Sequence, residues 1–204
     1  MNALIIVDVQ NDFLPGGALA VDEGDIVIPV INKLQNQFDL VVATQDWHPS
    51  AHRSFASMHA GKKVFEQIHL NGLPQVLWPN HCVQETAGAA FSSELNPKKI
   101  EAIFRKGMEK DIDSYSGFFD NGKKKATGMG AYLKGRGVSS IYVAGLAADY
   151  CVYFTALDGL ELGFKSMIIT DATRAINNKD FTTKLQEFNS KGGKEIKSKE
   201  IDFS

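Results

Sequence analysis

Short, unbroken runs of aliphatic residues are the feature of this sequence that most restricts its fold. Such runs occur at residues 3–7, 40–43, 141–144 and 167–169, with a less regular one at 100–104. A strand with one face in water alternates polar and apolar residues, whereas a strand covered on both faces is apolar throughout. The runs therefore predict buried strands of a parallel sheet, which needs helices on both sides.

The segments between these runs carry apolar residues at helical spacing. Helices are expected at residues 26–38, 126–134, 151–162 and 181–188, with a short edge strand at 194–197. Strands that alternate with helices through right-handed crossovers predict an α/β fold, a three-layer α/β/α arrangement around a doubly wound, mainly parallel sheet. No linker or internal repeat divides the 204 residues, so one domain over residues 1–204 is expected.

The charge balance gives no sign of a polyanionic partner. The chain has 22 basic and 24 acidic residues, a net charge of −2, so neither nucleic acid nor an acidic membrane surface is an expected partner. Its two cysteines are too few for a disulfide framework, and the N-terminal apolar stretch is too short for a signal peptide or a membrane span. We therefore expect a cytoplasmic protein that acts on a small molecule.

Reactive side chains follow the predicted strands where the strands end. Asp8 follows the first run, Lys106 follows the run at 100–104, and Cys151 begins the helix after the run at 141–144. Each residue alone is more simply explained as a cap, a solvated side chain or a buried thiol. Because ligands bind beyond the carboxyl ends of a parallel sheet, the three together predict a nucleophile, a base and an electrostatic helper. A helix N-terminus is expected to lower the pKa of the Cys151 thiol.

A second group of polar residues lies in the long loop region at residues 46–98, which holds all five histidines and no comparably clean strand. Asp46, His48 and His81 offer one carboxylate and two imidazoles, a ligand set that suits Zn²⁺, Fe²⁺ or Mn²⁺. From spacing alone, histidines that bond loop backbone are an equally good explanation. The Gly-Lys-Lys-Lys sequence at 122–125 is typical of a solvated turn.

Five blocks of this sequence resemble the nicotinamidase and pyrazinamidase branch of the isochorismatase-like cysteine hydrolases. The blocks are DVQNDF at 8–13, TQDWHP with HRSFA at 44–56, WPNHCVQ at 78–84, FRKG at 104–107 and VAGLAADYCV at 143–152. They follow the family's order over residues 1 to about 175. The resemblance implies the isochorismatase-like hydrolase fold.

The resemblance also implies roles for particular residues. Asp8, Lys106 and Cys151 would form a catalytic triad, and Asp46, His48 and His81 would bind one divalent metal ion, zinc in preference to iron or manganese. Some members use a further ligand at the position of His52, and Ser54 could contact the metal through water. Phe13 and Trp78 match the aromatic walls of the substrate pocket.

The implied activity is hydrolysis of nicotinamide to nicotinate and ammonia through a cysteine thioester, in NAD salvage, with pyrazinamide as a second substrate. A cis peptide joining Leu146 to Ala147 would place the Ala147 and Cys151 N–H groups as an oxyanion hole. A homo-oligomer is compatible with this family. The alternative is an amidase of the same superfamily that acts on a carbamoyl or ureido compound, but such substrates lack a ring nitrogen for the metal to bind.

The chain departs from the family's pattern in two places. Ala148 stands where Thr or another small residue is common, which should alter a local hydrogen bond rather than the reaction. The segment 108–128 matches no motif, so its part in the pocket rim is left open. A nucleotide-binding Rossmann protein is a further alternative, but the turn at 8–13 has no G-x-G-x-x-G sequence.

Overall fold

A six-stranded sheet forms the centre of the molecule. The computed structural model describes residues 1–203. The strands lie in the order β5-β2-β1-β6-β7-β8, and every neighbouring pair is parallel. Their bounds are β1 Asn2–Val7, β2 Leu40–Asp46, β5 Ile100–Lys106, β6 Ser140–Leu146, β7 Lys165–Arg174 and β8 Lys194–Ile196. The predicted α/β fold with a doubly wound sheet is confirmed, and this sheet is parallel throughout.

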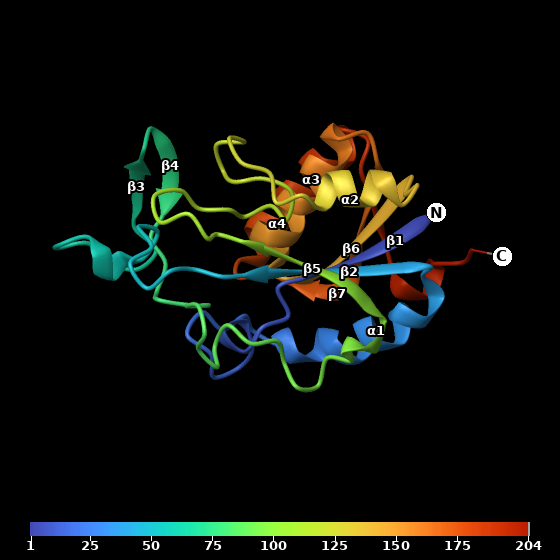
Figure 1. The fold of residues 1–204 in the computed structure, drawn as a ribbon, viewed down its shortest axis with the longest axis horizontal. Helices are drawn as coiled ribbons and strands as arrows, with labels where there is room; N and C mark the ends of the chain where they lie inside the picture. Colours follow the sequence, from blue (N-terminus) through green and yellow to red (C-terminus); the bar gives the residue numbers. More distant parts are fainter. Residues whose placement is uncertain (204) are drawn as a thin grey trace.

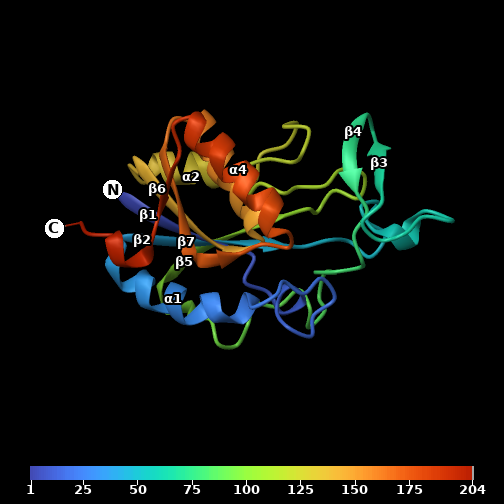
Figure 2. The same ribbon diagram turned by 180° about the vertical axis from the view of Figure 1, so that it is seen from behind.

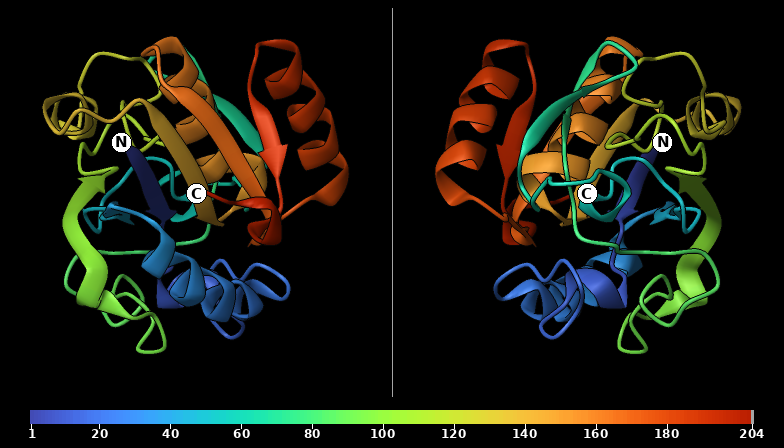
Figure 3. Two further views of the ribbon diagram at one scale, coloured as in Figure 1. Left: turned by 90° about the vertical axis from the view of Figure 1, so that its right-hand side faces the viewer. Right: turned by 90° about the vertical axis from the view of Figure 1, so that its left-hand side faces the viewer.

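Helices cover both faces of the sheet (Figures 1, 2 and 3). Helix α1 (Val27–Leu34) lies on one face, and α2 (Met129–Gly135), α3 (Tyr153–Glu161) and α4 (Asn178–Ser190) lie on the other. In β1, Leu4 and Ile6 pack into the cluster with α1, while Ile5 and its alternate neighbours pack into the opposite cluster. The unbroken aliphatic run thus supplies two cores at once. None of the helices in residues 1–203 is long and apolar enough to span a membrane.

Several predicted helix boundaries differ from the structure. Helix α2 begins at Met129 rather than at residue 126, because residues 126 and 127 pair with the backbone of residues 118 and 119. The expected helix over 26–38 is α1 with a 3₁₀ turn at each end, Gly24–Ile26 and Gln35–Gln37. A π-helical turn, Ala148–Val152, precedes α3, so the helical chain starts three residues before Cys151.

The sequence analysis missed a β-hairpin in the region 46–98. Strands β3 (Gln67–Leu70) and β4 (Leu73–Val76) pair antiparallel and form a separate two-stranded sheet. Their two-residue turn is Asn71-Gly72, and both residues have positive φ, 51° and 81°. Asn-Gly is the strongest short-range hairpin signal, so the turn was detectable even though the flanking strands are short and polar. Figure 1 shows the hairpin at the end of the molecule opposite both termini.

The chain reverses its direction of travel across the sheet between β1 and β6. From β1 the chain adds β2 and β5 on one side, and from β6 it adds β7 and β8 on the other. The carboxyl ends of β1 and β6 therefore flank the switch point at which open α/β sheets bind ligands. Gly145 of β6 pairs with Val7 of β1 at this place, with φ of 117°, and a Cβ there would overlap the Val7 carbonyl oxygen.

We expect Gly145→Ala to destabilise the protein, because the added methyl group must push β1 and β6 apart in a conformation that L-residues avoid. The loss in free energy of unfolding should exceed about 2 kcal/mol, at the upper side of ordinary point mutations. Gly135→Ala is the matched control, since nothing lies within 4 Å of a Cβ at Gly135. Urea denaturation of both variants is the measurement, and equal midpoints would contradict this account of the switch point.

Candidate active site

Three reactive side chains meet at the carboxyl ends of β1, β5 and β6. Asp8 follows β1, Lys106 is the last residue of β5, and Cys151 lies in the π-helical turn after β6. The Lys106 Nζ is 2.9 Å from Asp8 Oδ2 and 3.4 Å from Cys151 Sγ. All three residues are buried. The structure thus places a carboxylate, an ammonium and a thiol in mutual contact.

The Lys106 ammonium is the centre of this group. Its Nζ also lies 3.0 Å from Asp46 Oδ1 and donates a hydrogen bond of 3.0 Å to the Ser114 carbonyl oxygen. Burial would lower the pKa of Lys106, but the Asp46 and Asp8 carboxylates outweigh it and raise that pKa well above its usual value. Lys106 therefore stays charged although its side chain has no exposed surface.

The Cys151 thiol does not have the lowered pKa that the sequence analysis expected. Burial raises its pKa well above the ordinary value, and the opposing charge of Lys106 only offsets part of this effect. Burial also raises the pKa of Asp8, against the lowering effect of Lys106. The expectation was wrong because it weighed the helix terminus and left out desolvation. In the free protein Cys151 is a neutral thiol beside a carboxylate that can accept its proton.

The two oxygens of Asp8 have different surroundings. Asp8 Oδ1 accepts a hydrogen bond of 2.6 Å from the Thr44 hydroxyl, which fixes the orientation of the carboxylate. Asp8 Oδ2 is within ion-pair distance of Lys106, yet it has no well-directed hydrogen bond. A buried carboxylate oxygen without a directed donor keeps a lone pair for an incoming proton. Oδ2 is therefore the oxygen suited to exchange a proton with the thiol.

Asp46, His48 and His81 converge beside this group. One donor atom from each residue lies within 4.8 Å of the others, and all three residues are buried. Asp46 Oδ2 is 3.0 Å from His48 Nε2 and 3.5 Å from His81 Nε2. The Gln10 side chain fixes the Asp46 backbone, since its Nε2 donates to the Asp46 carbonyl and its Oε1 accepts from the Asp46 N–H, both at 2.8 Å.

The hydrogen bonds of the two imidazoles show that this set fits a metal ion. His48 Nδ1 donates to the Gly107 carbonyl at 2.9 Å, and His81 Nδ1 donates to the Pro79 carbonyl at 2.8 Å. These bonds place a ring proton on Nδ1 and direct each Nε2 toward the Asp46 carboxylate. Although burial opposes it, the Asp46 carboxylate raises the pKa of His48, so the space between these side chains favours a positive charge, either a ring proton or a bound cation. The donor set of two nitrogens and one oxygen suits a divalent transition metal.

Gly107 is necessary for the position of His48. It has φ of 66°, and a Cβ at this residue would lie 2.5 Å from His48 Cε1. Any side chain would therefore displace the imidazole that the Gly107 carbonyl holds. The Phe-Arg-Lys-Gly block at 104–107 thus supplies both the buried ammonium and the support for a candidate metal ligand.

His52 and Ser54 lie next to this set but point elsewhere. The His52 Nδ1 is 2.7 Å from the Ser54 hydroxyl oxygen, and its Nε2 is 3.3 Å from the Ile112 carbonyl oxygen. Burial and the neighbouring His48 lower the pKa of His52 to about 4, so its ring is neutral. His52 groups with His48 and Asp113, not with Asp46 and His81. Ser54 serves here as the partner of His52.

A small cavity adjoins the two groups. Its lining includes Asp46 and His81 together with Cys151 and Ala147. Phe13 and Trp78, the expected aromatic walls, both line it, and Phe13 packs edge-on against the His81 ring at 5.6 Å. The peptide bond between Leu146 and Ala147 is cis, as the resemblance implied.

Several lining residues were not found by sequence reasoning. They are Leu19, Asp113, Tyr115, Tyr150 and Ile176. Asp113 and Tyr115 come from the segment 108–128, which matched no motif, and Gln75 Nε2 of the missed hairpin reaches both, at 3.0 and 3.2 Å. Tyr150 precedes Cys151 and packs edge-on against Trp78 at 4.8 Å. Only Tyr150 carried a usable signal, its place beside the predicted nucleophile.

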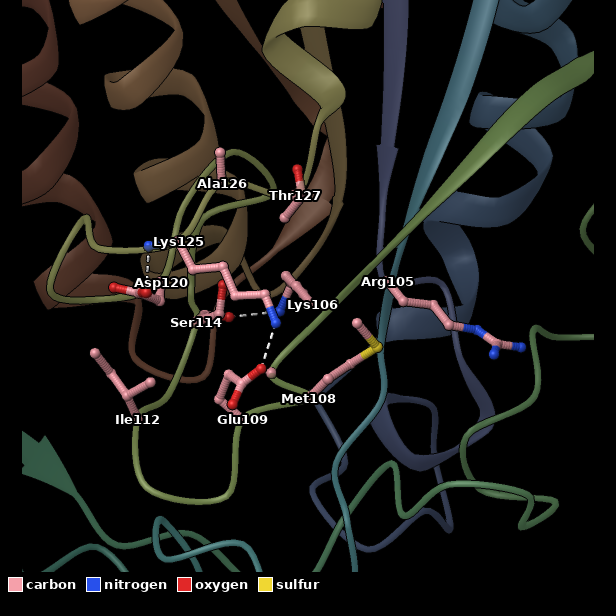
Figure 4. A pocket seen from close by; sticks show the side chains of 11 residues that line it. Arg105, Lys106, Met108, Glu109, Ile112, Ser114, Asp120, Lys125, Ala126 and Thr127 are labelled. Atoms are coloured by element: carbon pink, nitrogen blue, oxygen red, sulfur yellow. Dashed lines mark hydrogen bonds and ion pairs between the residues drawn. The ribbon is translucent and has the colours of Figure 1, made fainter.

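Lys106 also lines a second, larger cavity (Figure 4). Lys125 pairs with Glu109 across it, and Met108 and Ile112 give it an apolar part. Neither Cys151 nor any of Asp46, His48 and His81 lines this cavity. The reactive atoms face the smaller cavity, so size does not identify the site here.

The chain is similar to known proteins over nearly its whole length. The sequence model of a family described as the isochorismatase domain matches residues 2–200. The chain is 47% identical over 200 residues to a nicotinamidase of Acinetobacter baylyi, which covers 98% of this chain and 94% of the relative.

Two solved structures are similar to the whole chain. An Acinetobacter baumanii nicotinamidase and pyrazinamidase has a TM-score of 0.95 at 47% identity, over 97% of this chain and 96% of that chain. A pyrazinamidase of Pyrococcus horikoshii in complex with zinc has a TM-score of 0.80 at 40% identity, over 96% of this chain and 98% of that chain.

We expect iodoacetamide to alkylate Cys151 faster than Cys82, because Cys151 lines a cavity beside Lys106 whereas Cys82 has no exposed surface. Lys106→Met removes the charge that lowers the pKa of the Cys151 thiol, so its alkylation rate should rise only at higher pH than in the wild type. Mass spectrometry of labelled peptides across a pH series is the measurement. Lys125→Met, at an exposed lysine, is the control, and an identical profile for Lys106→Met would refute the coupling.

Proposed function

The chain belongs to the isochorismatase family, and on that premise we propose that it hydrolyses nicotinamide to nicotinate and ammonia, a step of NAD salvage. One observation carries the proposal: a single cavity is lined both by Cys151 and by the Asp46 and His81 donors. Such a cavity suits a flat aromatic ring that bears a carboxamide on one side and a basic nitrogen on the other. The similarity to a nicotinamidase over nearly the whole chain supports the same substrate.

The chain's own residues can carry out the first half of the reaction. Asp8 takes the proton of the Cys151 thiol, and the sulfur forms a bond to the amide carbon while the carbonyl π electrons move to oxygen. The N–H groups of Ala147 and Cys151 are the proposed donors to this oxyanion. Asp8 then returns the proton to the amide nitrogen and the carbon–nitrogen bond breaks. Ammonia leaves, and the acyl group stays on Cys151 as a thioester.

The second half uses the same carboxylate again. Asp8 accepts a proton from a water molecule, whose oxygen bonds to the thioester carbon, and the carbon–sulfur bond then breaks. The thiol of Cys151 regains the proton, and the carboxylic acid that forms is released as nicotinate after it loses its own proton to solvent. Throughout both halves Lys106 remains an ammonium, 2.9 Å from Asp8 Oδ2 and 3.4 Å from Cys151 Sγ, so it stabilises whichever of the two is negative.

A divalent metal ion completes the proposed site. Asp46, His48 and His81 would hold it, and zinc is the proposed ion, as in the complex of the Pyrococcus horikoshii pyrazinamidase. When bound, such an ion would supply a Lewis acid for the pyridine nitrogen, which would orient the ring. Phe13 and Trp78 supply apolar surface for the faces of the pyridine ring. The polar residues of the cavity must therefore decide how the ring is turned within its own plane.

We expect Cys151→Ala to abolish ammonia release while nicotinamide still binds, because the variant lacks the nucleophile but keeps the cavity. Asp8→Asn keeps the shape of the carboxylate without its proton-accepting capacity and should lower kcat by on the order of 10²–10⁴. Cys82→Ala should remain active. Steady-state ammonia assays and calorimetric binding are the measurements. Turnover by Cys151→Ala at the wild-type rate would refute the proposed nucleophile.

We expect benzamide to be a much poorer substrate than nicotinamide, since it has the same amide and almost the same shape but no ring nitrogen. Pyrazinamide, which keeps a nitrogen meta to the carboxamide, should behave like nicotinamide. Chelation of the metal should reduce nicotinamide turnover toward the level of benzamide. The values of kcat/KM for the three amides, before and after chelation, test this. If chelation leaves the discrimination unchanged, the cavity walls and not the metal recognise the ring.

A further inference from the structure

Asp113 is a buried carboxylate that the mechanism does not use. It belongs to the segment 108–128, is only 3% exposed, and lines the same cavity as Asp46, His81 and Cys151. Its Oδ1 accepts a hydrogen bond of 2.8 Å from the Ser114 N–H, and its Oδ2 accepts one of 3.0 Å from Gln75 Nε2. These two neutral donors fix its direction but leave its charge without a balancing cation.

No lysine, arginine or histidine within residues 1–203 forms an ion pair with Asp113. The imidazoles of His48 and His52 are its nearest candidates, and one donor atom from each of the three residues lies within 4.8 Å of the others. No hydrogen bond or ion pair joins either imidazole to Asp113. A buried carboxylate without a cationic partner is costly, so a cation that binds nearby is favoured.

The charges of the site balance only when Asp113 is included. Lys106 carries one positive charge and lies against Asp8, which carries one negative charge. Asp46 and Asp113 remain, and their two negative charges equal the charge of one divalent ion. Asp46 alone, with two neutral imidazoles, would leave a complex with a net positive charge in a buried cavity, which is unfavourable.

We propose that Asp113 is the second counter-ion of the metal centre: it does not ligate the ion directly but supplies the negative charge that Asp46 cannot. Asp113 is thus a positioning residue: the negative charge of its carboxylate would attract the metal ion from the side of the site where His48 lies. Gln75 of the β3–β4 hairpin and the Ser114 N–H hold the carboxylate in this direction. The Ser114 carbonyl oxygen in turn accepts from Lys106, so one short segment supports both charged groups of the site. This inference rests on the metal centre of the proposed function.

The test compares zinc affinity in the metal-free protein after removal of single carboxylates. Asp113→Asn keeps the shape of the side chain and removes its charge. Outer-shell substitutions typically cost about 10–100-fold in metal affinity, and we expect a rise of that size in the zinc dissociation constant, measured by competition with a chromophoric chelator. The increase in melting temperature that zinc produces should shrink in the same variant.

Asp120→Asn is the matched control, because Asp120 is another buried carboxylate of the same segment. Its oxygens accept from the backbone N–H groups of Gly122, Lys124 and Lys125. Figure 4 shows it in the neighbouring cavity, which is lined by none of the three candidate metal ligands. Asp120→Asn should lower the melting temperature of the metal-free protein and leave the zinc affinity unchanged.

Each outcome decides the question. A weaker zinc affinity in Asp113→Asn alone supports the proposal, while equal affinity in wild type and Asp113→Asn overturns it. An equal loss in both variants also overturns it, since the cause would be disturbance of the segment. If Asp113→Asn does not fold, Asp113→Ser gives the same comparison with a smaller uncharged side chain. Because no substrate is present, failure of zinc to bind the wild type would refute the metal centre itself, independently of the role of Asp113.

Discussion

The buried ammonium of Lys106 is in contact with both groups of polar residues in this site. Lys106 Nζ lies 2.9 Å from Asp8 Oδ2 and 3.0 Å from Asp46 Oδ1, so the same charge belongs to the proposed triad and to the proposed metal-binding set. A lysine without exposed surface can remain charged only if such partners repay its desolvation. The two carboxylates in turn stay ionised and correctly placed because the ammonium lies between them. Loss of Lys106 would therefore leave two buried carboxylates uncompensated.

The backbone makes this arrangement possible by bringing strand ends unusually close. β1 and β6 approach each other at the switch point where Gly145 faces Val7, and this approach sets Asp8 near the turn that carries Cys151. Gly107, directly after Lys106, permits the His48 ring to lie against its carbonyl. In both places a side chain would separate groups that must touch. Contacts between backbone segments thus fix the positions of the residues that carry the reactive atoms.

Desolvation then decides which protonation states the site adopts. Burial raises the pKa of Cys151 and of Asp8, although Lys106 opposes both shifts. These shifts favour the proton on the thiol, and in the proposed mechanism its transfer to Asp8 accompanies attack on the substrate. A thiol that is neutral at rest is also less exposed to oxidation, which begins from the thiolate. The neutral thiol is thereby protected from oxidation, but it needs a base to remove its proton before it can act as a nucleophile.

The sequence by itself determined the strands and the residues that end them. Unbroken aliphatic runs can be satisfied only by a sheet covered on both faces, and this requirement already placed Asp8, Lys106 and Cys151 at one edge. The resemblance added Asp46, His48 and His81 as a set, which the loop spacing alone had left undecided.

Only the tertiary structure decided the pKa of the thiol, the direction of His52 and the presence of Asp113 and Tyr115 in the cavity. These features depend on which loops cover the sheet edge. The segment 108–128 and the hairpin at Gln75 are distant in sequence from the strand ends that they bury, and neither has the periodicity that marks a core element. Local patterns record which residues must be buried, but desolvation and charge balance arise from contacts between distant segments, and no single stretch of sequence contains them.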